Sequence, residues 1–318
     1  MLIVSNYHYI RTDFKAKYES IFGVTPEQFE NQLLELKNHG TFISQEELLK
    51  FRNKKFDKNY ILVTFDDGLK EQYELARPIL KRLKIPFIFF INSSNFTDKK
   101  VSLVHKVHLL RSVLSTDEIL EVLETNSSQK LNDKELKFAE TNYLYDSKKT
   151  AILKYILNFK LSFKEQEETI DKVFGRYFDE EKVVKELYMS KEQLIELNEE
   201  GSLGSHSHNH FPLGTLNKSI IDIDIKKSQN YFEFELGKKA SSISYPYGSF
   251  EACEGVEEIA EKHNFKLGFS MERAARENIE TNSLLISRYD CNDLPGGKAS
   301  MFGDNNIFQE SEIAKWFK

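Results

Sequence analysis

The sequence predicts an α/β fold built on a parallel sheet or barrel, and three observations support this prediction. Strand and helix signals alternate along most of the 318 residues. The runs YILVTF (60–65) and PFIFFI (86–91) are continuously apolar, which is typical of parallel strands covered on both faces. No hairpin signal separates successive strands, so each connection is expected to return through a helix.

The first elements follow from local signals. A short apolar strand is expected at 2–4. The stretch TPEQ (25–28) is a capping box with proline at the first helical position, and Gly40 marks the end of that helix. SQEE (44–47) begins a second, shorter helix. After YILVTF, a helix over about 71–83 leads into PFIFFI.

Residues 97–188 differ from both flanks. They are rich in Lys, Glu and Leu, and VHKVHLLRSVL (104–114) and KKTAILKYILNF (148–159) have helical periodicity. We therefore predict a single domain over 1–318 with a helical insertion at 97–188, which serves as a lid or a dimer surface. The α/β alternation resumes at SKEQ (190–193). Strands are expected at 202–205, 241–245, 266–270 and 284–288, with a helix over 251–264.

Composition excludes several classes of protein. A net charge of -6 argues against a nucleic-acid surface, which needs a basic face. The apolar runs fall far short of the roughly 20 residues that span a bilayer. The N-terminus lacks the pattern of a secretory signal, and two cysteines, Cys253 and Cys291, form no disulfide framework. We expect a cytoplasmic protein; the oligomeric state is not indicated.

Two acidic residues follow the run YILVTF. In TFDDG (64–68), Asp66 and Asp67 end a strand and Gly68 allows a turn. Polar groups at the carboxyl ends of parallel strands meet at one rim, where barrel active sites lie. One carboxylate can hold a metal while the other handles protons. The alternative is a turn with Asp as a helix cap.

Three histidines alternate in GSHSHNH (204–210). In an extended strand His206, His208 and His210 share a face, whereas a helix would bring only His206 and His210 together. Either geometry makes the latter two a candidate chelate. Imidazole suits zinc, iron, nickel or copper. The alternative is a solvated histidine-rich loop.

A third segment, SYPYG (244–248), ends an expected strand in a turn whose Tyr245 and Pro246 offer a wall beside a substrate pocket. TFDDG, HSHNH and SYPYG, in this order, resemble the first three motifs of the polysaccharide deacetylase family (the NodB homology domain, carbohydrate esterase family 4 superfamily). NYHYIR (6–11), VTPEQFENQLLELKNHGTFISQEELL (24–49) and LLISRYDCNDLP (284–295) resemble one bacterial branch of it. The likeness covers roughly 1–96 and 189–300.

The resemblance implies a distorted barrel of seven or eight β/α units. It implies that Asp67, His206 and His210 bind a divalent metal, zinc in our expectation, and that Asp66 is the general base. It also implies that the backbone N–H of Tyr247 binds the oxyanion.

His208 occupies a variable family position, and we expect it to line the substrate pocket rather than to be a fourth ligand. Two metal-binding histidines and one carboxylate leave positions open, as in catalytic zinc sites.

Two departures from the family pattern concern catalysis. Many members carry Arg where this chain has Ser244, and the late histidine that serves as general acid is absent after His263. Arg288 is either the replacement partner of Asp66 or a structural ion pair. His8 is the first candidate for general acid and His105 (with its neighbour His108) the second; each has the alternative of a structural histidine.

These residues predict a metal-dependent hydrolase that removes an N-acyl group, acetyl in the first instance, from an amino sugar. The substrate is expected to be nucleotide-linked, lipid-linked or an oligosaccharide, in the synthesis of a surface polysaccharide. Two alternatives remain open at this point. One is an amidohydrolase for a small non-sugar amide, and the other is a catalytically inactive carbohydrate-binding homologue.

Overall fold

The computed structural model describes residues 1–15, 17–18, 23–127, 131–142, 147–280, 283–303 and 305–316. The chain divides into two compact units. One comprises residues 1–14, 22–99 and 184–318, and the other comprises 15–21 and 100–183. We call them the barrel unit and the helical unit and treat each by itself. Among the described residues, no helix has the length and apolarity needed to cross a bilayer.

The barrel unit is built on a curled sheet in which all pairings between strands are parallel. The strand order is β7-β6-β5-β4-β3-β1-β8, and β2 pairs with β3 outside this path. A parallel bridge between Phe269 and Ile286 links β7 to the segment before β8, so the curled sheet is a distorted, nearly closed barrel. This confirms the expected fold class. The strands are β1 (Leu2–Tyr7), β2 (Thr41–Phe42), β3 (Tyr60–Phe65), β4 (Phe87–Ile91), β5 (Leu203–Ser205), β6 (Ser242–Ser244), β7 (Leu267–Phe269) and β8 (Tyr289–Asp290).

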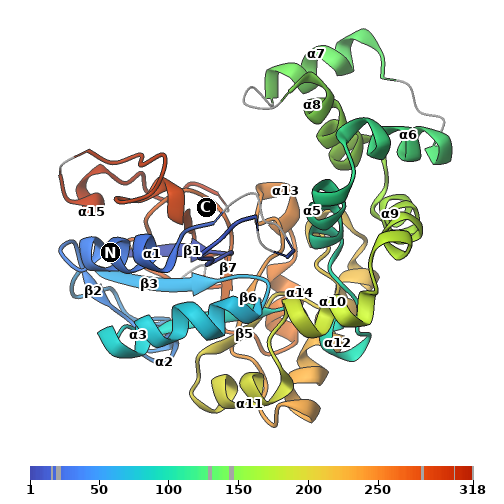
Figure 1. Cartoon of the computed structure of the whole chain (residues 1–318). Helices are drawn as coiled ribbons and strands as arrows, with labels where there is room; N and C mark the ends of the chain where they lie inside the picture. The colour runs from blue at the N-terminus through green and yellow to red at the C-terminus, as the bar shows by residue number, and fades with distance from the viewer. Residues whose placement is uncertain are drawn as a thin grey trace. The chain divides into compact units, whose positions relative to one another are not determined.

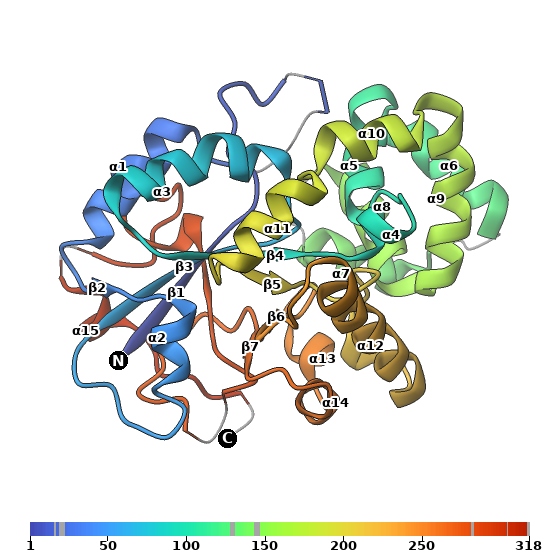
Figure 2. The same ribbon diagram turned by 90° about the horizontal axis from the view of Figure 1, so that it is seen from below.

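Helices cover the outer face of this sheet, with α1, α3 and α11 along one side of it (Figure 2). Phe29 and Leu33 of α1 pack with Val63 and Phe65 of β3 in the largest apolar cluster. The helices are α1 (Pro26–Leu36), α2 (Gln45–Leu49), η1 (Gln72–Ala76), α3 (Arg77–Leu83), α4 (Ser94–Thr97), α11 (Lys191–Glu199), η3 (Leu213–Thr215), α12 (Lys218–Glu235), α13 (Phe250–Cys253), α14 (Glu257–Lys262), η4 (Cys291–Asp293) and α15 (Ile307–Glu310).

Local signals account for most helix starts. Thr25, Ser44 and Ser190 each accept a hydrogen bond from the backbone N–H three residues on, in reciprocal capping boxes. The helix expected over 251–264 is instead two short helices, because Gly255 between them has a φ of 73°. The strand expected at 284–288 is displaced: the paired residues of β8 are Tyr289 and Asp290.

The helical unit contains α5 (Leu103–Val113), α6 (Thr116–Ser127), α7 (Asp133–Asn142), α8 (Lys148–Tyr155), η2 (Ile156–Lys160), α9 (Phe163–Tyr177) and the start of α10 (Glu180–Leu187) (Figure 1). Helix α5 packs against α9, and α7 packs against α8. The described part of 97–188 is therefore helical, while residues 128–130 and 143–146 of that expected insertion lie outside the described residues. Whether the segment is a lid or a dimer surface stays a prediction.

Candidate metal centre and active site

Alternation along the strands brings polar side chains to the inside of the barrel at one end. Asn6 pairs in register with Thr64, and Tyr7 pairs with Phe65. His8 and Asp66 therefore leave neighbouring strand ends on the same inner face, because side chains two apart along a strand share a face. Towards the other end of the barrel the inner face is apolar, with Val4, Leu62, Phe90 and Phe269 among its buried residues.

Asp67, His206 and His210 converge at this polar end. One ligand atom from each lies within 4.8 Å of the others, and all three residues are buried. Nε2 of His206 lies 3.6 Å from Oδ1 of Asp67, and Nε2 of His210 lies 3.4 Å from the same oxygen. Two ligand atoms bound about 2.1 Å from a tetrahedral zinc ion would be about 3.4 Å apart. The donor set and its spacing therefore fit a divalent ion such as zinc.

The ring of His206 is held in the form that a metal requires. Its Nδ1 lies 2.8 Å from the carbonyl oxygen of Ser244. Donation of the Nδ1 proton to this carbonyl leaves the Nε2 lone pair facing Asp67, the usual arrangement behind a metal-binding histidine. Burial lowers the pKa of His206 to about 4, against the opposing effect of Asp66, so the ring is neutral at neutral pH.

Three site residues have backbone angles that few side chains adopt. Asp67, His210 and Tyr247 have φ values of 78°, 60° and 63°. Such conformations are costly and occur where the surroundings impose them, often at functional sites. Beside them Gly68 has a φ of 64°, and a Cβ there would lie 2.6 Å from the Ile91 side chain. The turn that aims Asp67 inward therefore needs glycine at position 68.

A buried carboxylate, which sequence reasoning missed, accepts hydrogen bonds from residues 208 and 209 of the histidine loop (206–210). Oδ1 of Asp224, on α12, accepts the backbone N–H of His208 at 2.8 Å. Its Oδ2 accepts the backbone N–H of Asn209 at 3.0 Å and the Asn209 side chain at 2.9 Å. Asp224 is 1% exposed. It thereby positions the segment between His206 and His210, the two candidate metal-binding histidines.

His208 lies apart from the three candidate ligands. Its ring is buried, with Nδ1 2.8 Å from the Ser93 hydroxyl and Nε2 3.4 Å from Oδ2 of Asp98. These contacts agree with the expectation that it is not a fourth ligand. They tie the ring to α4, which gives no direct support to its expected place in the substrate pocket.

Asp66 forms a bidentate ion pair with Arg288. Nη1 of Arg288 lies 3.0 Å from Oδ1 of Asp66, and Nη2 lies 2.8 Å from Oδ2. The remaining donors of the guanidinium reach Asn6 Oδ1 (2.8 Å), the Ser244 hydroxyl (2.8 Å) and the Ser270 carbonyl (3.1 Å). Arg288 is fully buried. Of the two roles left open for Arg288, the geometry favours the partner of Asp66.

The charge of Asp66 is stabilised by its neighbours. Burial by itself would raise the pKa of this carboxyl, but Arg288 and His206 together hold it well below its usual range. Asn6 adds a hydrogen bond from Nδ2 to Oδ2 of Asp66 at 3.0 Å. Sequence reasoning missed Asn6, although its place two residues before His8 in a strand was a usable signal. Asp66 is therefore an ionised carboxylate beside the three candidate metal ligands.

His8 lies next to Asp66 through a shared backbone contact. The side-chain amide of Gln72 donates to the carbonyl oxygens of both His8 (2.9 Å) and Asp66 (2.6 Å). His8 is partly exposed, as a group that exchanges protons with solvent must be. The other candidate acid, His105, lies on α5 of the helical unit, where it is 1% exposed and its ring is 6.4 Å from that of His108.

The SYPYG turn (244–248) was expected to line a substrate pocket with Tyr245 and Pro246, but both of these residues are buried. Tyr247 is 47% exposed, and its ring centroid lies 5.2 Å from that of His210. Pro246 is buried. Tyr245 is fully buried, and its hydroxyl donates to the carbonyl of Leu284 at 2.8 Å. The Tyr245 side chain therefore lies in the core between β6 and the segment before β8, which differs from the expected pocket wall.

Fold and site together define a class: a parallel α/β barrel with a candidate divalent-metal site and a neighbouring ionised carboxylate at one end. The polysaccharide deacetylase family model matches residues 53–126 and 164–268, more than half of the chain. The chain therefore belongs to the polysaccharide deacetylase family.

Curated relatives agree with this assignment. The chain is 29% identical over 172 residues to a poly-beta-1,6-N-acetyl-D-glucosamine N-deacetylase of Staphylococcus aureus, covering 50% of the chain and 56% of that protein. It is 32% identical over 133 residues to the protein of the same name from Staphylococcus epidermidis, covering 36% and 43%. The matches thus span about half the length of these relatives.

Solved structures share the fold. A de-N-acetylase from Aggregatibacter actinomycetemcomitans has a TM-score of 0.54 at 16% identity, covering 97% of this chain and 98% of that one. IcaB from Ammonifex degensii has a TM-score of 0.52 at 18% identity, with coverage of 91% and 90%. At these identities the likeness is one of fold.

Proposed function

We propose that this chain is a metal-dependent hydrolase that removes the N-acetyl group from an amino-sugar residue of a glycan. One observation carries the proposal: Asp67, His206 and His210 converge at the barrel end where Asp66 is paired with Arg288. Three metal ligands of this kind leave coordination positions open for substrate, which is the pattern of catalytic rather than structural zinc.

Zinc is the ion that we propose for the three ligands. A neutral imidazole with its second nitrogen on a carbonyl, as in His206, is a good zinc ligand. A bound divalent ion supplies Lewis acidity that activates water and polarises the amide carbonyl.

Asp66 is the proposed general base. In the reaction a water oxygen bonds to the acetyl carbon, the C–N bond breaks, and Asp66 takes the proton that the water gives up. Arg288 positions this carboxylate with two hydrogen bonds and keeps it ionised, at some cost in basicity. Asn6 fixes the same carboxylate from the β1 side.

Two further groups complete the proposed reaction. The backbone N–H of Tyr247 is assigned to the oxyanion, which its positive φ and its place beside His210 support. His8 is assigned as the acid that protonates the leaving amine, because it follows β1 as Asp66 follows β3. The products are acetate and a free amino sugar.

The substrate class rests on the relatives. Both curated relatives are named for poly-beta-1,6-N-acetyl-D-glucosamine, which favours an N-acetylglucosamine oligomer as the substrate of this chain. A role in surface-polysaccharide synthesis belongs to the same proposal. The cytoplasmic location and a nucleotide-linked or lipid-linked form of the substrate stay predictions; cell fractionation with an antibody to the chain tests the location.

The test combines metal analysis with acetate release. We expect the purified protein to contain about one zinc per chain and to release acetate from β-1,6-linked N-acetylglucosamine oligomers. His206→Ala and Asp67→Ala should lose both metal and activity. Asp66→Asn should keep the metal and lose activity.

His263→Ala is the matched control, because His263, which directly follows α14, is paired with the partly exposed Asp222 of α12. It should change neither readout. Bound zinc without acetate release from these oligomers, or from a panel of small acetamides, would identify the chain as an inactive glycan-binding homologue. Release from small acetamides alone would identify an amidohydrolase.

A further inference from the structure

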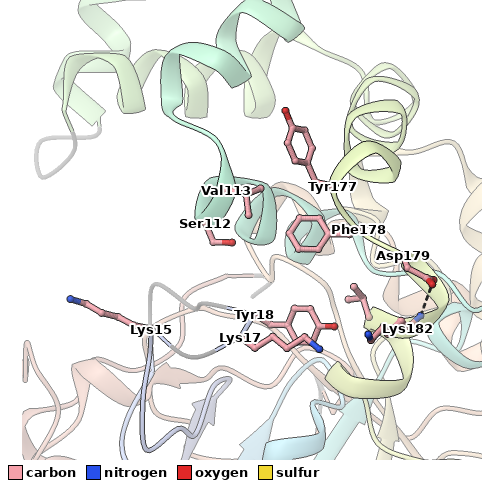
Figure 3. A pocket seen from close by; sticks show the side chains of 10 residues that line it. Lys15, Lys17, Tyr18, Ser112, Val113, Tyr177, Phe178, Asp179 and Lys182 are labelled. Carbon is pink, nitrogen blue, oxygen red and sulfur yellow. Dashed lines mark hydrogen bonds between the residues drawn. The ribbon is translucent and has the colours of Figure 1, made fainter.

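The helical unit contains a pocket of its own. Its volume is about 500 Å³, within the range of small-molecule sites, and the lining residues that the structure describes belong to this unit. They come from three segments: the stretch that contains Lys17 and Tyr18, the end of α5 with Val113, and the junction of α9 and α10 from Tyr177 to Lys182 (Figure 3).

One side of the pocket is apolar and aromatic. Tyr177 is 51% exposed and Val113 is 48% exposed, so both leave large apolar surfaces open to solvent. Phe178 is half-buried and fixed by stacking on Phe174, with ring centroids 4.9 Å apart. Aromatic rings combine a flat apolar face with a polar edge, which suits the apolar face of a sugar ring.

The other feature of the pocket is positive charge. Among the lining residues that the structure describes, Lys15, Lys17 and Lys182 are basic and Asp179 is acidic. Oδ1 of Asp179 accepts the backbone N–H of Lys182 at 3.2 Å, so this carboxylate caps the start of α10. Lys17 lies over the ring of Tyr18 at 5.0 Å. The described part of the lining is thus basic, in a chain whose net charge is -6.

We propose that this pocket binds a sugar that carries a phosphate group. A neutral glycan would contact the aromatic side without using the positive charge of the lining. Inorganic phosphate would use the lysines but not Tyr177 and Val113. A phosphorylated sugar uses both, with its ring against Tyr177 and its phosphate between Lys17 and Lys182, which point toward the same part of the hollow (Figure 3).

The proposal concerns the helical unit by itself, so the probe is chosen to lack an acetamide and cannot be hydrolysed as the proposed substrate is. Binding of glucose 1-phosphate to the full chain is measured by calorimetry, next to UDP-glucose, maltose and inorganic phosphate. We expect glucose 1-phosphate to bind more tightly than either maltose or phosphate. Tighter binding of UDP-glucose would identify a sugar nucleotide as the occupant, and equal binding would identify the sugar phosphate itself; either result supports the proposal.

Variants then place the ligand in this pocket. Lys182→Glu should weaken glucose 1-phosphate binding about tenfold or more, since a hydrogen bond to a charged group is lost. An acidic residue in the first turn of α10 favours that helix, so the variant should fold. Tyr177→Ser should weaken binding through loss of the exposed ring.

The control is Lys164→Glu, at the opposite end of α9, where the Lys164 side chain is 83% exposed. It should bind glucose 1-phosphate as the wild type does. The proposal is overturned if Lys164→Glu weakens binding as much as Lys182→Glu, if inorganic phosphate binds as tightly as glucose 1-phosphate, or if the sugar phosphate does not bind. None of these results bears on acetate release, which tests the metal centre alone.

Discussion

Replacing Arg288 by methionine tests the buried ion pair with Asp66 at the polar end of the barrel. The side chain is fully buried, and all of its hydrogen bonds go to protein acceptors, including both oxygens of Asp66. Methionine fills a similar length but donates nothing. The variant therefore leaves a buried carboxylate without its counter-charge, together with the Ser244 hydroxyl and the Ser270 carbonyl.

The expected loss in the free energy of unfolding is large because the unpaired carboxylate of Asp66 is buried. Removing one partner from a buried ion pair costs about 3–5 kcal/mol, whereas an exposed pair is worth about 0–1 kcal/mol. Asp66 also loses the effect that holds its pKa below the usual range, so burial raises the pKa of this carboxyl. If Asp66 is the general base, the acidic limb of the pH–rate profile moves to higher pH.

The measurement is urea unfolding at pH 7 with the pH profile of acetate release. Arg273→Met is the matched control, because Arg273 pairs with Asp293 at 2.9 Å and its side chain is 61% exposed. The sign of the pH effect follows from linkage. A carboxyl with a lowered pKa in the fold stabilises it above the unfolded pKa of about 3.9, and this contribution is lost as the pH falls below that value.

The double variant Asp66→Asn, Arg288→Met separates the ion pair from packing. Removing both charges should recover part of the stability that Arg288→Met loses, because no unpaired charge remains. The reasoning is refuted if Arg288→Met costs less than about 1 kcal/mol, like the surface control, or if the double variant is no more stable than the single one.

Three further predictions use matched positions. Gly68→Ala and Gly201→Ala both put a side chain at positive φ (64° and 71°), but only at Gly68 would the new Cβ meet a neighbouring side chain, at 2.6 Å. Urea unfolding should show that Gly201→Ala lowers the free energy of unfolding by about 1–2 kcal/mol and that Gly68→Ala lowers it further. Asp224→Ala removes the acceptor of three hydrogen bonds to the histidine loop and should weaken zinc binding about tenfold or more in a chelator competition. Asp222→Ala, at a partly exposed position on the same helix, should leave zinc binding unchanged. In the metal-free protein the pKa of His206 is about 4, below its unfolded value of about 6.5, so the unfolded chain takes up a proton first. The free energy of unfolding should therefore fall as the pH drops from about 6.5 to 4. His206→Gln should abolish that part of the pH dependence, and an unchanged slope would contradict the prediction.

The sequence alone predicted the candidate metal ligands Asp67, His206 and His210, because the signals for them are local. TFDDG ends the apolar strand β3 and HSHNH directly follows β5. The carboxyl ends of parallel strands meet at one rim whatever the details of the fold. Period-two alternation then aims Asp66 and His206 inward. The same locality explains the helix starts at Thr25, Ser44 and Ser190, where the cap and its partner are three residues apart.

Tertiary structure decided what depends on residues distant along the chain. Arg288 directly precedes β8, and it reaches Asp66 because β8 pairs with β1. Arg288 lies 282 residues from Asn6 of β1, and nothing local to either segment indicates that pairing. Asp224 holds the histidine loop through the packing of α12, and Tyr245 enters the core because Leu284 offers an acceptor there. The local sequence at a strand end predicts which side chains point into the barrel. Only the packed fold decides which charge, acceptor or ring each side chain contacts, because those contacts join segments that are distant along the chain.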